Sequence, residues 1–118
     1  MANKKVNGDR YAYASIDTAP GEGGYWSDAV SMSNKNTKSL FFSYRGGGVG
    51  TVTIQFKCPE DDDWTDLTTD QTIEDGVRFI VEDFASGVKY RAGLKEDVNS
   101  SAANDTYTSG TIICGFDW

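Results

Sequence analysis

The fold class is decided by residues 51–58, Thr51-Val52-Thr53-Ile54-Gln55-Phe56-Lys57-Cys58. Apolar and polar residues alternate along this stretch. Because successive side chains of a β-strand point to opposite faces, a period of two predicts a strand with one buried face and one solvated face. We expect Val52, Ile54, Phe56 and Cys58 to face a core, and Thr51, Thr53, Gln55 and Lys57 to face solvent. Pro59 cannot donate a hydrogen bond to a neighbouring strand and ends the pattern.

The same alternation returns twice toward the C-terminus. In residues 87–95 the apolar face is Val88, Tyr90, Ala92 and Leu94, and in residues 110–118 it is Ile112, Cys114, Phe116 and Trp118. Ile113 interrupts the polar face of the last strand, which predicts cover on both sides. Weaker strands are expected within residues 10–16, 25–32, 40–44, 64–68 and 77–81. About eight short strands without a convincing helix predict one antiparallel all-β domain, a sandwich or a barrel, over residues 9–118.

Turn-forming residues separate these strands. Gly46-Gly47-Gly48 would join two adjacent strands as a hairpin, and the polar residues 97–105 would form a loop. The first eight residues are polar and lean basic. We expect them to be a flexible arm, disordered or ordered only by a partner.

Catalytic equipment is sparse in this chain. Its 118 residues include no His, which removes the commonest general base and the commonest metal ligand. Asp61-Asp62-Asp63 offers oxygen ligands for calcium, but a solvated acidic loop is the favoured interpretation. Cys58 and Cys114 are expected to be buried free thiols, with a disulfide between facing strands as the alternative. We therefore predict no enzymatic activity, no cofactor and no metal site.

The charge balance also bears on partners. Eighteen acidic against eleven basic residues give a net charge of −7, which disfavours nucleic acid and anionic membrane surfaces. No signal peptide or long apolar run follows Met1, so synthesis in the cytoplasm is expected. The candidate partner-binding residues are Lys4 and Lys5 in the arm and Tyr25 and Trp26 beside Gly23-Gly24. Exposed aromatic rings anchor protein interfaces or stack on sugars, although core packing is the alternative for Trp26.

Two stretches resemble small virion proteins of tailed bacteriophages, of the capsid decoration (cement) or fibre type. One is residues 50–57 followed by Trp64-Thr65-Asp66, and the other is residues 88–95, then 107–111, ending in Gly115-Phe116-Asp117-Trp118. The resemblance implies a jelly-roll-like β-sandwich and a homodimer or homotrimer on the capsid surface of a virion, bound to the major capsid protein. The alternative is a fibre or carbohydrate-binding module that contacts host glycans, for which Tyr25 and Trp26 beside the Gly-rich turn are the reason.

Overall fold

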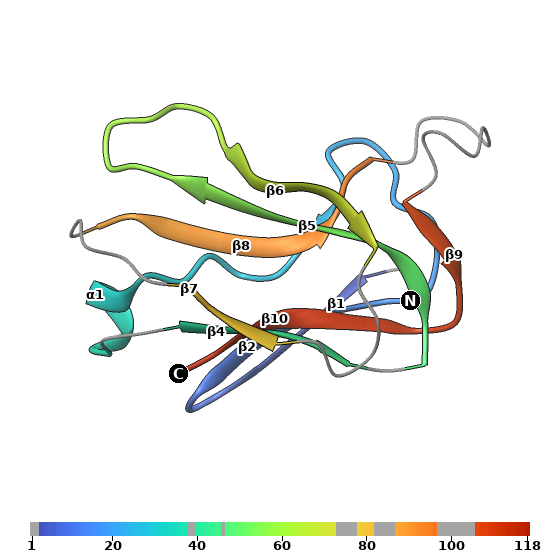
Figure 1. The fold of residues 1–118 in the computed structure, drawn as a ribbon, viewed down its shortest axis with the longest axis horizontal. Helices are drawn as coiled ribbons and strands as arrows, with labels where there is room; N and C mark the ends of the chain where they lie inside the picture. The colour runs from blue at the N-terminus through green and yellow to red at the C-terminus, as the bar shows by residue number, and fades with distance from the viewer. Residues whose placement is uncertain (1–2, 38–39, 46, 73–77, 82–86, 97–105) are drawn as a thin grey trace.

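The computed structural model describes residues 3–37, 40–45, 47–72, 78–81, 87–96 and 106–118. Two antiparallel sheets pack face to face (Figure 1), so the predicted all-β sandwich is confirmed. The first sheet has the order β1 (Asn3–Gly8), β2 (Tyr11–Ile16), β10 (Ile112–Asp117), β4 (Leu40–Arg45) and β7 (Arg78–Val81). The second has the order β3 (Tyr25–Trp26), β8 (Lys89–Leu94), β5 (Val49–Lys57) and β6 (Thr65–Thr72), and β9 (Tyr107–Ser109) pairs with the start of β5.

The strand order is that of a jelly roll. Without β1 and β9, the strands counted along the chain lie as 1-8-3-6 in the first sheet and 2-7-4-5 in the second. Most consecutive strands therefore belong to opposite sheets. The predicted hairpin at Gly46-Gly47-Gly48 is wrong for this reason, because β4 and β5 are not paired and the chain crosses between sheets there. The Tyr44 hydroxyl donates a 2.7 Å hydrogen bond to the Gly48 carbonyl at this crossing.

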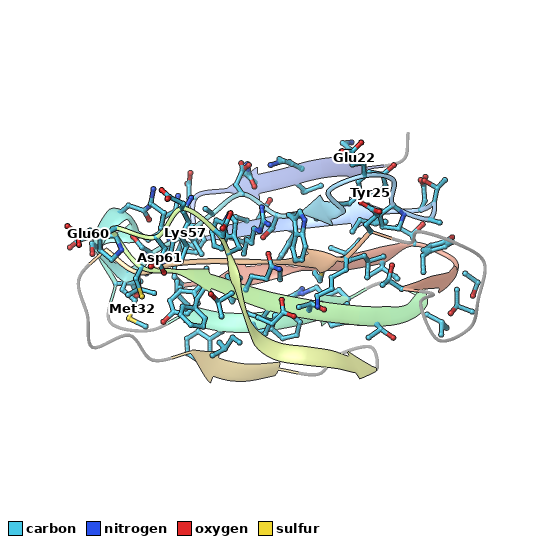
Figure 2. The ribbon with its side chains drawn as sticks, turned by 90° about the horizontal axis from the view of Figure 1, so that it is seen from above. Glu22, Tyr25, Met32, Lys57, Glu60 and Asp61 are labelled. Carbon is cyan, nitrogen blue, oxygen red and sulfur yellow. The ribbon has the colours of Figure 1, made fainter. Side chains whose placement is uncertain are left out.

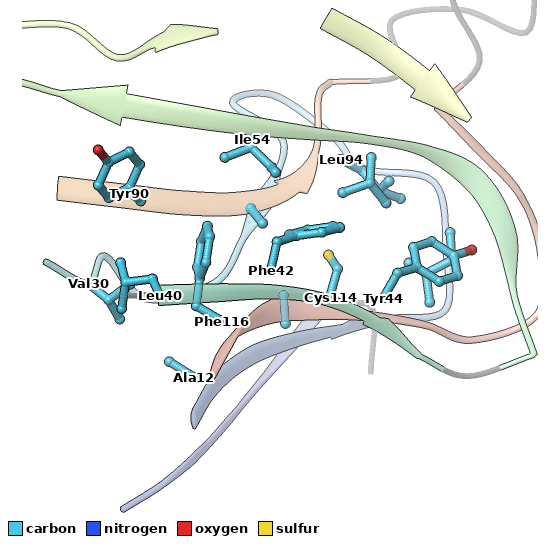
Figure 3. Close-up of a cluster of buried hydrophobic side chains, with 14 of the residues drawn as sticks. Ala12, Val30, Leu40, Phe42, Tyr44, Ile54, Tyr90, Leu94, Cys114 and Phe116 are labelled. Carbon is cyan, nitrogen blue, oxygen red and sulfur yellow. The ribbon is translucent and has the colours of Figure 1, made fainter. Parts of the chain in front are cut away.

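The core lies between the sheets and contains the predicted apolar faces (Figure 3). Val52 and Ile54 of β5 are buried, as are Ala92 and Leu94 of β8. Figure 3 shows the rings of Phe42, Tyr90 and Phe116 gathered between the layers. Phe56, Cys58 and Trp118 are only partly buried and pack against the rim of this cluster. Cys58 and Cys114 are both free thiols.

The N-terminal residues correct the expectation of a flexible arm. Residues 3–8 form strand β1, which pairs with β2 from Asn3 opposite Ile16 to Gly8 opposite Tyr11. Two side chains on β1 also reach the other sheet's edge, because Lys5 Nζ and Asn7 Nδ2 each lie 2.7 Å from the carboxylate of Asp28. β1 is therefore an edge strand of the sandwich.

The segment after β3 departs from the expected strand. Only Tyr25–Trp26 is a strand within residues 25–32, and Val30 forms a single bridge to Tyr90. A four-residue helix, α1 (Met32–Lys35), follows, where no helix was predicted. Its N-cap, Ser31, exchanges hydrogen bonds with Asn34, which supplies the local reason for the turn. The loop predicted at residues 97–105 lies outside the described residues.

Candidate functional site

The four residues predicted to bind a partner do not form one site. Lys4 is exposed on β1, whereas the Lys5 ammonium is paired with Asp28. Tyr25 packs against the core. Trp26 is 9 % exposed, and its indole N–H donates a 2.7 Å hydrogen bond to the Gly23 carbonyl. Of the four, only Trp26 belongs to the larger arrangement that covers the outer face of the second sheet.

That arrangement is centred on Arg91 of β8. Its guanidinium carbon lies 4.3 Å from the ring centroid of Trp26 and 4.4 Å from that of Trp64. Cation–π attraction to both indoles holds the guanidinium group in place. Lys57 continues the series, with its ammonium 5.8 Å from the Trp64 centroid. Burial lowers the pKa of Arg91, whose side chain remains a cation at any physiological pH.

A chain of hydrogen bonds lies beside this stack. Arg91 Nε donates to Gln55 Oε1 at 2.9 Å, and Gln55 Nε2 donates to Asp66 Oδ1 at 2.9 Å. The other Asp66 oxygen accepts a hydrogen bond from the Lys95 ammonium. Burial alone would raise the pKa of Asp66, but the bonds from Lys95 and Gln55 outweigh it and the pKa is lowered. The carboxylate stays charged and fixes Gln55, which in turn orients Arg91.

Part of the predicted solvent face of β5 is wrong. Thr53 and Gln55 were expected to face solvent, but they are 1 % and 8 % exposed. A sequence signal for this was Gly93, which pairs with Trp26 across β8 and β3. A Cβ at Gly93 would lie 1.9 Å from the Tyr25 carbonyl oxygen, so the strands approach too closely for a side chain. Glycine inside a strand often marks such an approach.

The same face concentrates positive charge on an acidic protein. We define the cationic face as the outer surface of the second sheet bearing Trp26, Gln55, Lys57, Trp64, Asp66, Lys89, Arg91 and Lys95. It holds four cations, and Asp66 is the one carboxylate among these residues, although the net charge of the chain is −7. β6 carries a register irregularity here, because Ile54 pairs with Thr68 whereas Gln55 pairs with Asp66. The intervening Leu67 is 45 % exposed beside the face.

The outer face of the first sheet is different in character. Tyr11 and Tyr13 stack with ring centroids 5.2 Å apart, and Arg45 lies 5.6 Å from the Tyr13 centroid. The Tyr13 hydroxyl donates to Asp117. Burial, followed by this hydrogen bond, raises the pKa of Tyr13 to about 12. The cluster is closed on itself, because Arg45 also pairs with Asp117.

Within the described ranges, no group of three or more Cys, Asp or Glu side chains is placed to hold a metal ion. Asp61 and its acidic neighbours are exposed, and the Asp61 carboxylate accepts from the Cys58 backbone N–H at 2.9 Å. No helix among the described residues is long and apolar enough to cross a bilayer. No protein-family model and no curated protein matches the chain.

Proposed function

We propose that this chain is a non-enzymatic structural protein of a tailed bacteriophage, a decoration protein that binds the outer surface of the head shell. Its partners are the major capsid protein and further copies of itself, as a homodimer or homotrimer. The cationic face is the observation that carries the proposal. It presents the half-buried Trp64 and Arg91 in a fixed arrangement, with the buried Trp26 supporting the guanidinium group from below. Trp and Arg are among the residues most enriched where protein interfaces gain their affinity.

The resemblance to small virion proteins supports a location on the head shell of a phage. A jelly roll with a strand added at one edge suits a compact module carried on a shell. The acidic balance keeps such a protein soluble while many copies accumulate before assembly.

Stabilisation would follow from mass action. A protein that binds the assembled shell, and not its separated subunits, stabilises each site by RT ln(1 + [L]/Kd), about 2.7 kcal/mol at a hundredfold excess over Kd. Repetition over the symmetry-related sites of a shell multiplies the effect. No covalent step is required, in agreement with the lack of His.

The test uses shells assembled without the protein. Purified chain is mixed with these shells and sedimented, and the pellet is assayed for bound copies and for the temperature at which shells break. We expect saturable binding at a fixed copy number and a higher breaking temperature. Absence of the protein from the pellet at micromolar concentration would rule out the decoration role.

The glycan-binding alternative loses its motive. It required free ring faces at Tyr25 and Trp26, whereas Tyr25 packs against the core and Arg91 lies over the Trp26 ring. We therefore put forward the decoration role alone.

A further inference from the structure

The end of the cationic face carries a cross-strand pair of like charges. Lys57 on β5 and Lys89 on β8 are direct register partners, and both side chains lie on the outer side of the sheet. Directly opposed residues of an antiparallel pair have Cβ atoms only about 4.5–5.5 Å apart, so two ammonium groups there repel each other. Neither lysine forms an ion pair with any of the described residues.

The acidic residues 60–63 follow β5 at this end of the face, but none of these described residues forms an ion pair with Lys57 or Lys89. Figure 2 shows Lys57 with Glu60 and Asp61 at the end of the molecule that also holds Met32 of α1. The carboxylate of Asp61 is engaged by the Cys58 backbone N–H. A pair of like charges that persists in a fold without a carboxylate in contact with it is typical of a functional surface.

Arg91 lies two residues further along β8, and only part of its hydrogen-bonding capacity is used by the described residues. Its Nε–H is used by Gln55, and within the described part of the chain its four Nη–H donors have no hydrogen-bond acceptor. A planar guanidinium group held between two rings is ready for bidentate contact with a carboxylate. Lys57, Lys89 and Arg91 together therefore form a receptor for several anionic oxygens.

We propose that the cationic face docks onto a protein surface bearing Asp and Glu carboxylates, with Lys57, Lys89 and Arg91 as the recognising cations. The inference rests on the proposed function and names the shell subunit as the carboxylate-bearing partner. A protein partner is favoured over a polyanion because the cations are few and are interleaved with Trp26 and Trp64. Exposed Leu67 adds an apolar contact at the border of the face, as protein interfaces require.

The decisive variant is Lys89→Glu. Its matched control is Lys4→Glu, because Lys4 lies on β1 of the first sheet and is not part of the cationic face. Each replaces one exposed lysine and takes the net charge from −7 to −9. Lys89→Glu also converts the repulsive pair with Lys57 into an attractive one, so its melting temperature should equal or exceed that of the wild type. We expect roughly a tenfold or greater loss of shell binding for Lys89→Glu and less than about a twofold change for Lys4→Glu.

The outcomes separate the two proposals. If the wild type binds shells and Lys89→Glu binds equally well, the cationic face is not the docking surface, and the decoration role stands. Equal losses in both variants would show that net charge alone acts, and would also overturn the face. If the wild type does not bind shells, the decoration role fails, and the face is then judged with a soluble probe.

The soluble probe is poly-L-glutamate, followed by tryptophan fluorescence because Trp26 and Trp64 flank Arg91. We expect a saturable change in the wild type that weakens in Lys89→Glu and in high salt. No change with poly-L-glutamate would overturn carboxylate recognition. Tighter binding to heparin than to poly-L-glutamate would overturn the assignment to a protein partner in favour of a sulfated glycan.

Discussion

Tyr13 on β2 lies directly opposite Gly115 on β10, and its ring covers the glycine. A Cβ built on Gly115 would lie 2.8 Å from Tyr13 Cδ1 and 2.0 Å from the Ala12 carbonyl oxygen. The same relation recurs between Tyr11 and Gly8, where a Cβ would fall 2.5 Å from the ring. Aromatic rings that lie flat on the sheet thus require glycine at the opposing position.

Gly115→Ala should lower the free energy of unfolding by about 1–3 kcal/mol, because the new methyl group meets a backbone oxygen that no rotamer change can move. Urea denaturation measures the loss. Gly21→Ala is the control, since nothing lies within 4 Å of its Cβ position and a change within about 0.5 kcal/mol is expected. Equal effects of the two substitutions would contradict the close approach at Gly115.

The Tyr13 hydroxyl should titrate late. Burial and the hydrogen bond to Asp117 raise the pKa of Tyr13 from its ordinary value of 10.0 to about 12. Because the folded-state pKa is raised, the stabilising contribution of the neutral hydroxyl is complete below pH 10. It is lost as the pH rises through about 12. The difference in phenolate absorbance between the wild type and Tyr13→Phe isolates this group, and a difference centred near pH 10 would refute the assignment.

The period-two pattern of the sequence predicts much of the fold. The inward faces of β5, β8 and β10 follow from alternation alone, because each strand has one face in the core. Alternation does not predict which of the outward-facing residues are buried by other side chains. Thr53 and Gln55 look solvated from their polarity, yet both are buried, and Gln55 is hydrogen-bonded between Arg91 and Asp66. Trp26, Trp64 and Arg91 come from three separate segments, so no local pattern predicts their stacking.

The connections and the edge strand were equally hard to predict. A glycine run between two apolar stretches favours a hairpin locally, but the jelly-roll path sends β4 and β5 to opposite sheets. β1 is polar because an edge strand needs little burial, and polarity alone is also typical of a flexible arm. The sequence marks Lys4 and Lys5 as candidate partner-binding residues, whereas the pairing of Lys5 with Asp28 depends on the tertiary fold.

Replacing Gln55 should disturb the cationic face without removing a side chain from the hydrophobic core. Gln55→Met leaves Arg91 Nε and Asp66 Oδ1 without their 2.9 Å partner, which should cost about 1–3 kcal/mol of unfolding free energy. Gln55→Glu keeps an acceptor for Arg91 but sets two carboxylates side by side.

The carboxylate pair in Gln55→Glu makes that loss depend on pH. One of two adjacent carboxylates has a raised pKa, so Gln55→Glu should be least stable near neutral pH and recover as the pH falls and the pair takes up a proton. Denaturation at pH 7 and pH 5 measures this recovery. A loss in Gln55→Glu that does not change with pH would show that residue 55 does not contact Asp66.

Removal of residues 1–8 distinguishes an edge strand from a loose arm. An arm could be deleted without loss, but β1 pairs with β2 through Lys4 opposite Ser15 and Val6 opposite Tyr13. The truncated chain should therefore unfold at lower urea concentration, and the β2 amides that faced β1 should exchange faster with deuterium. If the exchange rates of the β2 amides did not change, residues 1–8 would be a loose arm and not an edge strand.

Lys5→Met separates the ion pair from the strand pairing. The hydrogen bond from Lys5, followed by that from Asn7, lowers the pKa of Asp28, so the stabilisation is present at neutral pH and is lost as the pH falls through the lowered value. Lys5→Met should return the Asp28 pKa, followed by NMR, toward 3.8. Because the two side chains are 49 % and 46 % exposed, the loss of unfolding free energy should stay below about 1 kcal/mol. A loss as large as that caused by truncation would mean that the ion pair, and not the backbone pairing of β1, holds the N-terminus in place.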